Sequence, residues 1–294
     1  MRKIVLFFLL LLFFKPSVNG QIDSLLNELI HEKTDTGKVL LHIKIAYEYG
    51  WNSPDSSVVH ATAAKEISKR LNYQKGLFLS YIALSDSRYV TGDYGKGLSE
   101  AKEALIIARK NKREDWEMKT CGTLGLLYTQ TGKYKDAIGY FETLITSNKK
   151  NKNEKGLATA INNLANCYLS LKDYPKSIEI RKQAISIRKK LNLENALGDS
   201  FNDLGETYSK IGMLDSAIYY LKKCLEIKER IHDDEMSALS SFNLGNVFLI
   251  KKDLVTAKQY LNKSYQLSIK IQSKSYQLVA LNSLADAASI EKKQ

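Results

Sequence analysis

The sequence has few of the residues on which catalytic and metal sites depend. It contains 4 histidines and 3 cysteines in 294 residues, and neither type recurs with the spacing of metal ligands. The histidines pair with no cysteine or serine in a nucleophile motif, and no glycine-rich phosphate-binding loop follows a predicted strand. We therefore expect no catalytic residue, no metal site, no cofactor and no small-molecule substrate.

Proline and cysteine are also too scarce for several fold types. The 3 prolines favour long helices, because proline disrupts the interior of a helix. Cys121, Cys167 and Cys224 are odd in number and fall at different positions of the repeat described below. Buried free thiols are therefore expected, and a disulfide framework is not.

The longest apolar run, residues 4–14, lies at the N-terminus after Arg2 and Lys3. A bilayer-spanning helix needs about 20 apolar residues, so this run is short. Val18 and Gly20 occupy the −3 and −1 positions of a cut after Gly20. We predict a signal peptide over residues 1–20 and an exported protein, periplasmic or secreted. The alternative is an uncleaved membrane anchor; otherwise the protein meets the membrane only through a partner.

The excess of basic residues indicates which kinds of partner the protein binds. The formal net charge is +12, and it becomes +9 when Arg2, Lys3 and Lys15 are removed with residues 1–20. In an exported protein, this excess favours acidic proteins or anionic envelope components over nucleic acid.

A repeat of 40 residues runs through most of the chain. In four strong copies, a leucine is followed by a small residue and, four positions after the leucine, by an aromatic residue. The leucines of these copies are Leu124, Leu164, Leu204 and Leu244. The register continues to Leu84 and Leu284 without an insertion. Such self-similarity is typical of repeat architectures.

Each repeat has the features of a helical hairpin. A turn comes eight residues after the leucine, where glycine allows the positive φ that ends a helix. Asp93, Asp173 and Asp253 are suitable caps for the following helix. A column of small residues, which lets two helix backbones approach closely, then recurs every 40 residues: Ser57, Gly97, Ala137, Ser177, Ala217 and Ala257.

The combined pattern of L-G-x-x-Y, G-x-Y and a small residue resembles the tetratricopeptide repeat family over residues 36–294. The period exceeds the usual ~34 residues of the family, which implies longer helices. In this respect the chain is similar to kinesin light chain and to bacterial peptide receptors of the Rap type. The resemblance implies an all-α fold, a right-handed α-solenoid of stacked helical hairpins.

The resemblance and the N-terminal pattern together divide the chain into four segments. We predict a signal peptide over 1–20, a helical lead-in over 21–35, six repeats over 36–275 and a capping helix over 276–294. A truncated seventh repeat is the alternative for the last segment.

In such solenoids the first helices line the concave side, so their polar columns are the candidate binding surface. An asparagine side chain offers donors and an acceptor that can pair with the backbone of an extended peptide. The candidate peptide-binding residues are Asn162, Asn166, Asn202, Glu206, Asn243, Asn246 and Asn282. The alternative is that these side chains bind local backbone groups or face solvent.

A basic column recurs near the predicted ends of the second helices. Its members are Arg70, Lys110, Lys150, Lys190, Arg230 and Lys270. Cations near a helix C-terminus interact favourably with the helix dipole, which is sufficient to explain the column. The alternative is an edge that binds an acidic partner.

These observations favour a scaffold that binds a protein or peptide in a concave groove and catalyses nothing. One alternative is an extracytoplasmic sensor component of a bacterial signalling system that lacks its own output domain. Another is a structural subunit of an envelope or secretion assembly. The identity of the partner does not follow from the fold.

Overall fold

The chain folds into α-helices joined by short turns. The computed structural model describes residues 18–50 and 52–292, which form fourteen α-helices and no strand. Most of the predicted signal peptide, residues 1–17, lies outside the described residues. The helical-hairpin solenoid expected from the sequence is confirmed.

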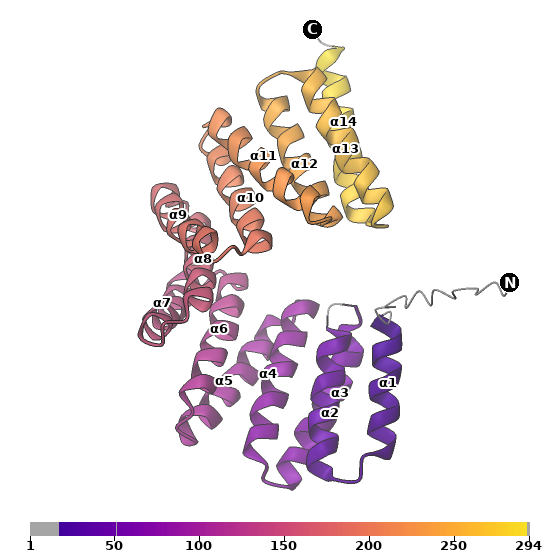
Figure 1. Ribbon diagram of the computed structural model, residues 1–294, viewed down its shortest axis with the longest axis vertical. Helices are drawn as coiled ribbons and strands as arrows, with labels where there is room; N and C mark the ends of the chain where they lie inside the picture. The colour runs from indigo at the N-terminus through magenta and orange to yellow at the C-terminus, as the bar shows by residue number, and fades with distance from the viewer. Residues whose placement is uncertain (1–17, 51, 293–294) are drawn as a thin grey trace, which may run out of the picture. The chain divides into compact units, whose positions relative to one another are not determined.

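The chain divides into two compact units, residues 1–127 and residues 128–294, which we call the N-terminal and C-terminal units. In the N-terminal unit each helix from α1 to α4 packs against the next one along the chain, and α2 also contacts α4 (Figure 1). Its helices are α1 (Val18–His31), α2 (Asp35–Tyr49), α3 (Pro54–Arg70), α4 (Gln74–Thr91), α5 (Tyr94–Lys110) and most of α6 (Glu114–Gln130).

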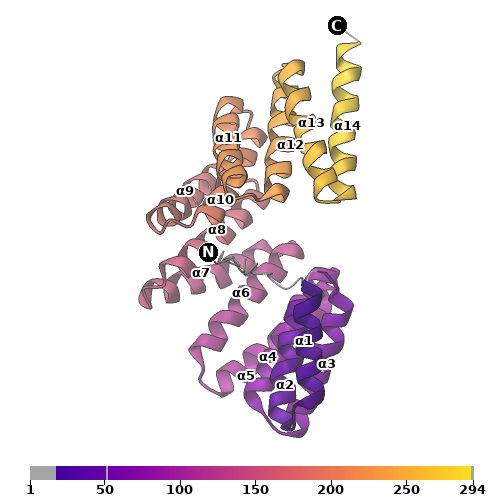
Figure 2. The same cartoon turned by 45° about the vertical axis from the view of Figure 1, so that its right-hand side comes forward.

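The C-terminal unit repeats the same arrangement. Its helices are α7 (Tyr134–Lys150), α8 (Glu154–Ser170), α9 (Tyr174–Lys190), α10 (Glu194–Lys210), α11 (Leu214–Arg230), α12 (Asp234–Ile250), α13 (Leu254–Lys270) and α14 (Lys274–Glu291). Helices α12, α13 and α14 pack side by side (Figures 1 and 2). From α2 onward, even-numbered helices are the first helices of the hairpins and odd-numbered ones are the second.

The turns inside the hairpins form as the sequence predicts. Gly92, Gly132 and Gly212 have positive φ, and Asp93, Asp173 and Asp253 each accept a hydrogen bond from a backbone amide in the first turn of the next helix. The turns between hairpins were not anticipated. Each contains a non-glycine residue at positive φ, namely Asn72, Lys112, Lys152, Asn192, His232 and Gln272.

The column of small residues lies where the two helices of each hairpin meet. Ser57, Ala137, Ser177, Ala217 and Ala257 are at most 3% exposed. Close to this column, a glycine on the first helix faces a leucine on the second helix. A Cβ added to Gly205 would lie 2.6 Å from Cγ of Leu221, and one added to Gly245 would lie 2.6 Å from Cγ of Leu261.

The aromatic residues of the repeat stack in pairs between the two helices of a hairpin. Tyr128 stacks on Tyr140, Tyr208 on Tyr220, and Phe248 on Tyr260, with ring centroids 5.5–5.6 Å apart. Stacked pairs of this kind contribute more than their buried area alone. The aromatic position of the repeat therefore serves packing.

The three cysteines are free and buried, as expected from the sequence. Burial raises the pKa of Cys121 and of Cys224 to about 11. A thiol with such a pKa is almost entirely protonated at neutral pH and therefore unreactive.

Candidate binding sites

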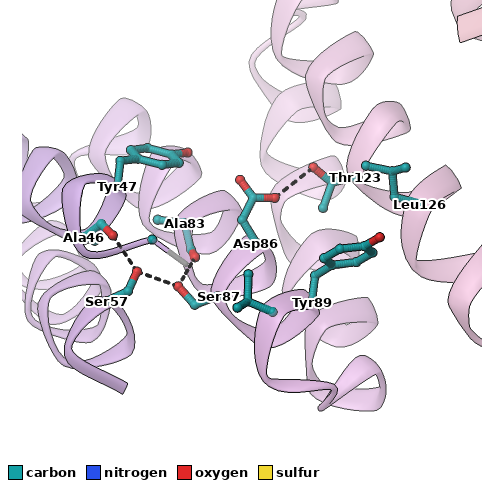
Figure 3. Close-up of a pocket in the computed structure, with 11 residues that line it drawn as sticks. Ala46, Tyr47, Ser57, Ala83, Asp86, Ser87, Tyr89, Thr123 and Leu126 are labelled. Carbon is teal, nitrogen blue, oxygen red and sulfur yellow. Dashed lines mark hydrogen bonds between the residues drawn. The ribbon is translucent and has the colours of Figure 1, made fainter. Parts of the chain in front are cut away.

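The N-terminal unit contains a cavity of ≈ 290 Å³ bordered by first helices of three successive hairpins. Tyr47 lies on α2, Asp86 and Tyr89 on α4, and Thr123 and Leu126 on α6 (Figure 3). Tyr47 is 42% exposed and Leu126 is 38% exposed, so both apolar surfaces remain accessible. The volume is near the lower end of the ~300–1,000 Å³ range of ligand sites.

The floor of this cavity is formed by small residues whose polar groups are already paired. The Ser57 hydroxyl donates to the carbonyl of Ala46 at 2.6 Å and lies 2.7 Å from the Ser87 hydroxyl, which in turn donates to the carbonyl of Ala83 at 2.8 Å (Figure 3). Because these hydroxyls form hydrogen bonds with one another and with the helix backbone, the floor offers a ligand few free hydrogen-bonding groups.

Asp86 is the charged residue among those that line the cavity. Its carboxylate accepts a long hydrogen bond, 3.4 Å, from the hydroxyl of Thr123. Burial raises the pKa of Asp86 to about 6, although nearby Lys119 opposes the rise. The Lys119 ammonium donates to the Tyr47 hydroxyl at 3.3 Å and lies 5.3 Å from the centroid of that ring.

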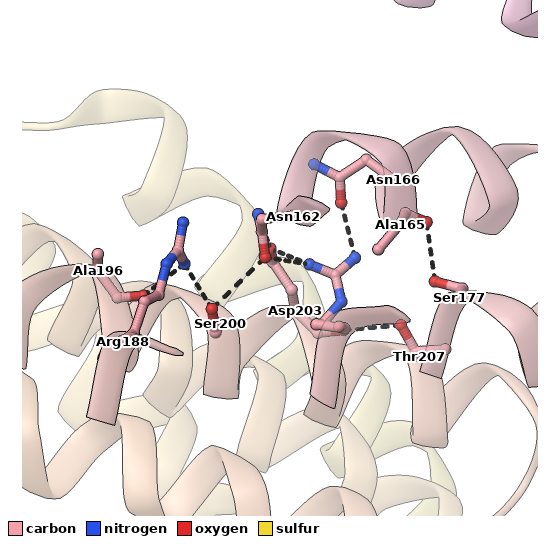
Figure 4. Close-up of polar contacts among 10 residues, drawn as sticks. Asn162, Ala165, Asn166, Ser177, Arg188, Ala196, Ser200, Asp203 and Thr207 are labelled. Atoms are coloured by element: carbon pink, nitrogen blue, oxygen red, sulfur yellow. Dashed lines mark hydrogen bonds and ion pairs between the residues drawn. The ribbon is translucent and has the colours of Figure 1, made fainter. Parts of the chain in front are cut away.

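The C-terminal unit contains a different feature, a buried polar network centred on Arg181 of α9. The Arg181 side chain is fully buried, and its guanidinium donates to Asp203 at 2.5 Å, Asn162 at 3.0 Å and Asn166 at 2.7 Å (Figure 4). Burial lowers the pKa of Arg181 and raises that of Asp203, and each charge opposes the shift of the other. The network thus joins α8, α9 and α10.

Two further buried cations extend this pattern. Arg188 of α9 donates to the carbonyl of Ala196 at 2.7 Å and to the hydroxyl of Ser200 on α10 (Figure 4). Lys228 of α11 pairs with Asp199 at 2.5 Å and with Asp233 at 3.0 Å. In each case a cation on a second helix is neutralised or hydrogen-bonded by groups on first helices or in a turn.

The expectation that the asparagines are free to bind a peptide is wrong for Asn162 and Asn202. They are 8% and 4% exposed. The carbonyl oxygen of Asn162 accepts from Arg181, and that of Asn202 accepts from Asn243 at 3.0 Å. Asn162 is thus bound by the second helix of its own hairpin, and Asn202 by the first helix of the next hairpin.

The other predicted residues are more accessible. Asn166, Asn243 and Asn246 are half-buried, and Asn282 on α14 is exposed. Glu206 forms an ion pair with Lys210, one turn further along α10, at 2.6 Å. Asn166 and Asn243 nevertheless already bind Arg181 and Asn202.

The basic column lies at the ends of second helices, as predicted, and four of its members pair with acidic residues at the start of the first helix in the same hairpin. Lys110 and Lys150 end α5 and α7 at the same register. The pairs are Arg70–Asp35 at 2.9 Å, Lys190–Glu154 at 2.6 Å, Arg230–Glu194 at 2.8 Å and Lys270–Asp234 at 2.6 Å. These four cations are therefore engaged within their own hairpins and do not form a row reserved for an acidic partner.

Neither Asp86 nor Arg181 was predicted from the sequence to be a functional residue. Arg181 shares its register with Phe141, Leu221 and Leu261, all fully buried, so its position in the repeat was a signal that it is buried too. Asp86 shares its register with Asn166, Glu206 and Asn246, and nothing in that polar column distinguishes it.

Models of the tetratricopeptide repeat match residues 120–155 and residues 156–230. Residues 120–230 therefore carry tetratricopeptide repeats, and the resemblance inferred from the sequence is confirmed. No characterised protein sequence matches the chain significantly.

Several solved structures share the fold. BtubC (BKLC) from P. vanneervenii is 22% identical with a TM-score of 0.64, and the match covers 75% of this chain and 93% of that one. The apo form of RapI is 15% identical with a TM-score of 0.69, covering 87% and 93%. A Rap protein in complex with competence and sporulation factor is 16% identical with a TM-score of 0.65, covering 95% and 82%.

The described residues offer no cluster of three or more histidine, cysteine or acidic side chains that could hold a metal ion. Every helix in residues 18–50 and 52–292 is too short or too polar to cross a bilayer.

Proposed function

We propose that this protein is an exported scaffold that holds a peptide or a segment of another protein along the first helices of its N-terminal unit. The tetratricopeptide fold supports a role in protein binding. The cavity between Tyr47, Asp86 and Leu126 is the observation that carries the proposal, because it combines accessible apolar walls with one charged group. Such a combination is typical of a binding site.

The proposed ligand is a peptide segment, since the cavity suits a single side chain. A Rap protein of similar fold binds competence and sporulation factor. That likeness supports a ligand-binding role for the fold. The second candidate is a sensor component that passes a peptide signal to a separate output protein. The two differ in the consequence of binding and not in the site.

Site-specific photo-crosslinking tests the location of the ligand. A photoreactive phenylalanine derivative replaces Leu126, which borders the cavity, or, as the control, Val255 on the second helix α13, which is 71% exposed. The protein is irradiated in an envelope extract. We expect a discrete adduct from position 126 and none from position 255. Equal adducts from both positions, or adducts from 255 alone, would place the binding surface elsewhere.

Export rests on the composition of residues 1–20, with basic residues before an apolar run and small residues before the cut. The test is the N-terminal sequence of the protein recovered from the cell envelope or medium. A first residue of Gln21 supports the proposal, and an intact Met1 in the cytoplasmic fraction contradicts it.

A further inference from the structure

The cavity of the N-terminal unit has an unusual distribution of charge. Its walls and floor are largely apolar or internally paired, yet Asp86 places a carboxylate against them. Removing a carboxylate from water is costly unless hydrogen bonds or a counter-ion replace the lost hydration. The free protein supplies only part of that replacement at this position.

The hydrogen bonding of the Asp86 carboxylate is weak for a carboxylate beside an apolar cavity. The hydrogen bond from Thr123 is 3.4 Å long, beyond the 2.5–3.0 Å usual for hydroxyl donors. Within the described residues, the other carboxylate oxygen makes no hydrogen bond or ion pair with protein atoms. Asp86 can therefore accept stronger, charge-assisted hydrogen bonds from an incoming donor.

The aromatic residues around Asp86 suit a cation with an apolar stem. Tyr47 lies beside Asp86 on one side, and Tyr89 follows it on the same helix (Figure 3). Tyrosine faces attract cations as well as aliphatic chains. The protein's own Lys119 lies 5.3 Å from the centroid of the Tyr47 ring and donates to its hydroxyl at 3.3 Å, so a basic side chain of a ligand would share this ring with Lys119 or displace it.

We infer that the cavity takes the basic side chain of a bound peptide, an arginine or a lysine, with its charged head on Asp86 and its stem against Tyr47 and Leu126. This inference rests on the proposed function and adds the chemical class of one ligand residue. The cavity, at ≈ 290 Å³, has room for one long side chain. An acidic side chain would face Asp86 with a like charge.

Positional peptide libraries test the inference without knowledge of the natural ligand. Fluorescent hexapeptides, acetylated and amidated to remove terminal charges, carry one fixed residue and random residues elsewhere. The fixed residue is arginine, lysine, glutamate or citrulline, the last being an uncharged isostere of arginine. Binding to the full chain is measured by fluorescence anisotropy at pH 7.5. The variants are Asp86→Asn and Asp286→Asn, the latter an exposed aspartate at the same register on α14.

We expect the arginine and lysine libraries to bind roughly ten- to a hundredfold more tightly than the citrulline library, the range for a hydrogen bond to a charged group. Asp86→Asn should remove this preference, and Asp286→Asn should keep it. If peptides bind with no preference for a basic residue, or if Asp86→Asn leaves the preference intact, the inference is wrong while the proposed function stands. If no library binds, both are overturned.

Discussion

The two units place polar residues at the same repeat positions and use them in opposite ways. In the N-terminal unit, Asp86 faces a cavity and makes one long hydrogen bond. In the C-terminal unit, Asn166 at the same register accepts a 2.7 Å hydrogen bond from the buried guanidinium of Arg181. A polar column on first helices is therefore accessible in one unit and used for internal packing in the other.

Whether these polar residues are accessible depends on a residue of the second helix. At the register of Arg181, the N-terminal unit has Ala61 and Ala101, both fully buried, whose side chains end at Cβ. Arg181 extends far enough to reach the polar groups of α8 and α10. Small residues on the second helix leave the polar side chains of the first helices available, whereas a long cation forms hydrogen bonds with them. A polar side chain on a first helix is therefore available to a ligand only where no residue of the second helix reaches it.

The largest expected effect comes from removing the cation of the C-terminal network. Arg181→Leu leaves Asp203 half-buried without its counter-ion, and we expect a loss of about 3–5 kcal/mol. Leucine is the residue at the same register in the next two hairpins, so its size is compatible with the site. Hydrogen exchange should show the loss in α8, α9 and α10, with α2 and α4 as the internal reference. Exchange is preferred because repeat arrays often do not unfold in one step.

The matched double variant separates charge from packing. Arg181→Leu with Asp203→Asn removes both members of the ion pair, and replacing a buried pair in this way is often neutral. We expect most of the lost protection to return. A double variant as unstable as Arg181→Leu alone would show that the other hydrogen bonds of the guanidinium, and not its pairing with Asp203, hold the three helices together.

The next effect concerns the close approach of helices, which the units also achieve differently. Gly205 faces Leu221 in the C-terminal unit, whereas Ser85 and Ala101 occupy the corresponding positions in the N-terminal unit. Gly205→Ala would place a Cβ 2.6 Å from Cγ of Leu221, so we expect a loss of about 1–3 kcal/mol from overpacking. Gly139→Ala, whose Cβ would meet nothing within 4 Å, is the control, and it should stabilise α7 because alanine is the better helix former. Thermal melts followed by circular dichroism measure both. A destabilised Gly139→Ala would contradict the packing explanation.

A smaller effect is expected from the accessible carboxylate of the N-terminal unit. The pKa of Asp86 in the folded protein is about 6, above its ordinary value of 3.8, so the folded state binds this proton more tightly than the unfolded state. The contribution of Asp86 to stability therefore becomes less favourable as pH rises from about 4 to above 6. Lys119 on α6, Tyr47 on α2 and Tyr89 on α4 are the other titratable groups that face the site.

Asp86→Asn removes this penalty, so it should stabilise the N-terminal unit by about 1–2 kcal/mol at pH 7 and by much less at pH 4. The melting temperatures of the native chain and the variant are compared at both pH values, with Asp286→Asn as the control that should show no such difference. A variant that is less stable than the native chain at pH 7 would show that the Asp86 carboxylate is structurally required.

The sequence was sufficient for those parts of the fold that repeat. The 40-residue register, the buried small column and the aspartate caps depend on local chemistry that recurs in several hairpins, so each copy supports the others. The candidate binding residues could not be obtained in the same way. Whether Asn162 faces a groove or a neighbour depends on Arg181, 19 residues away on another helix. Arg181, a charged residue at a register where other hairpins have an apolar one, was a better guide to these contacts than the repeated asparagines.

The smallest expected effect concerns the ion pairs that join the ends of each hairpin. Lys190→Ala removes the contact with Glu154, whose side chain is 41% exposed, while Lys110→Ala changes a position whose counterpart at the start of α4 is the uncharged Gln74. Exposed pairs are worth roughly 0–1 kcal/mol, so we expect Lys190→Ala to lower stability slightly more than Lys110→Ala. Melts at low salt and at 1 M salt provide the test, because screening should abolish the difference between the two variants. A difference that persists at 1 M salt would have to come from the packing of the lysine stem, since the Coulombic part of the contact is screened there.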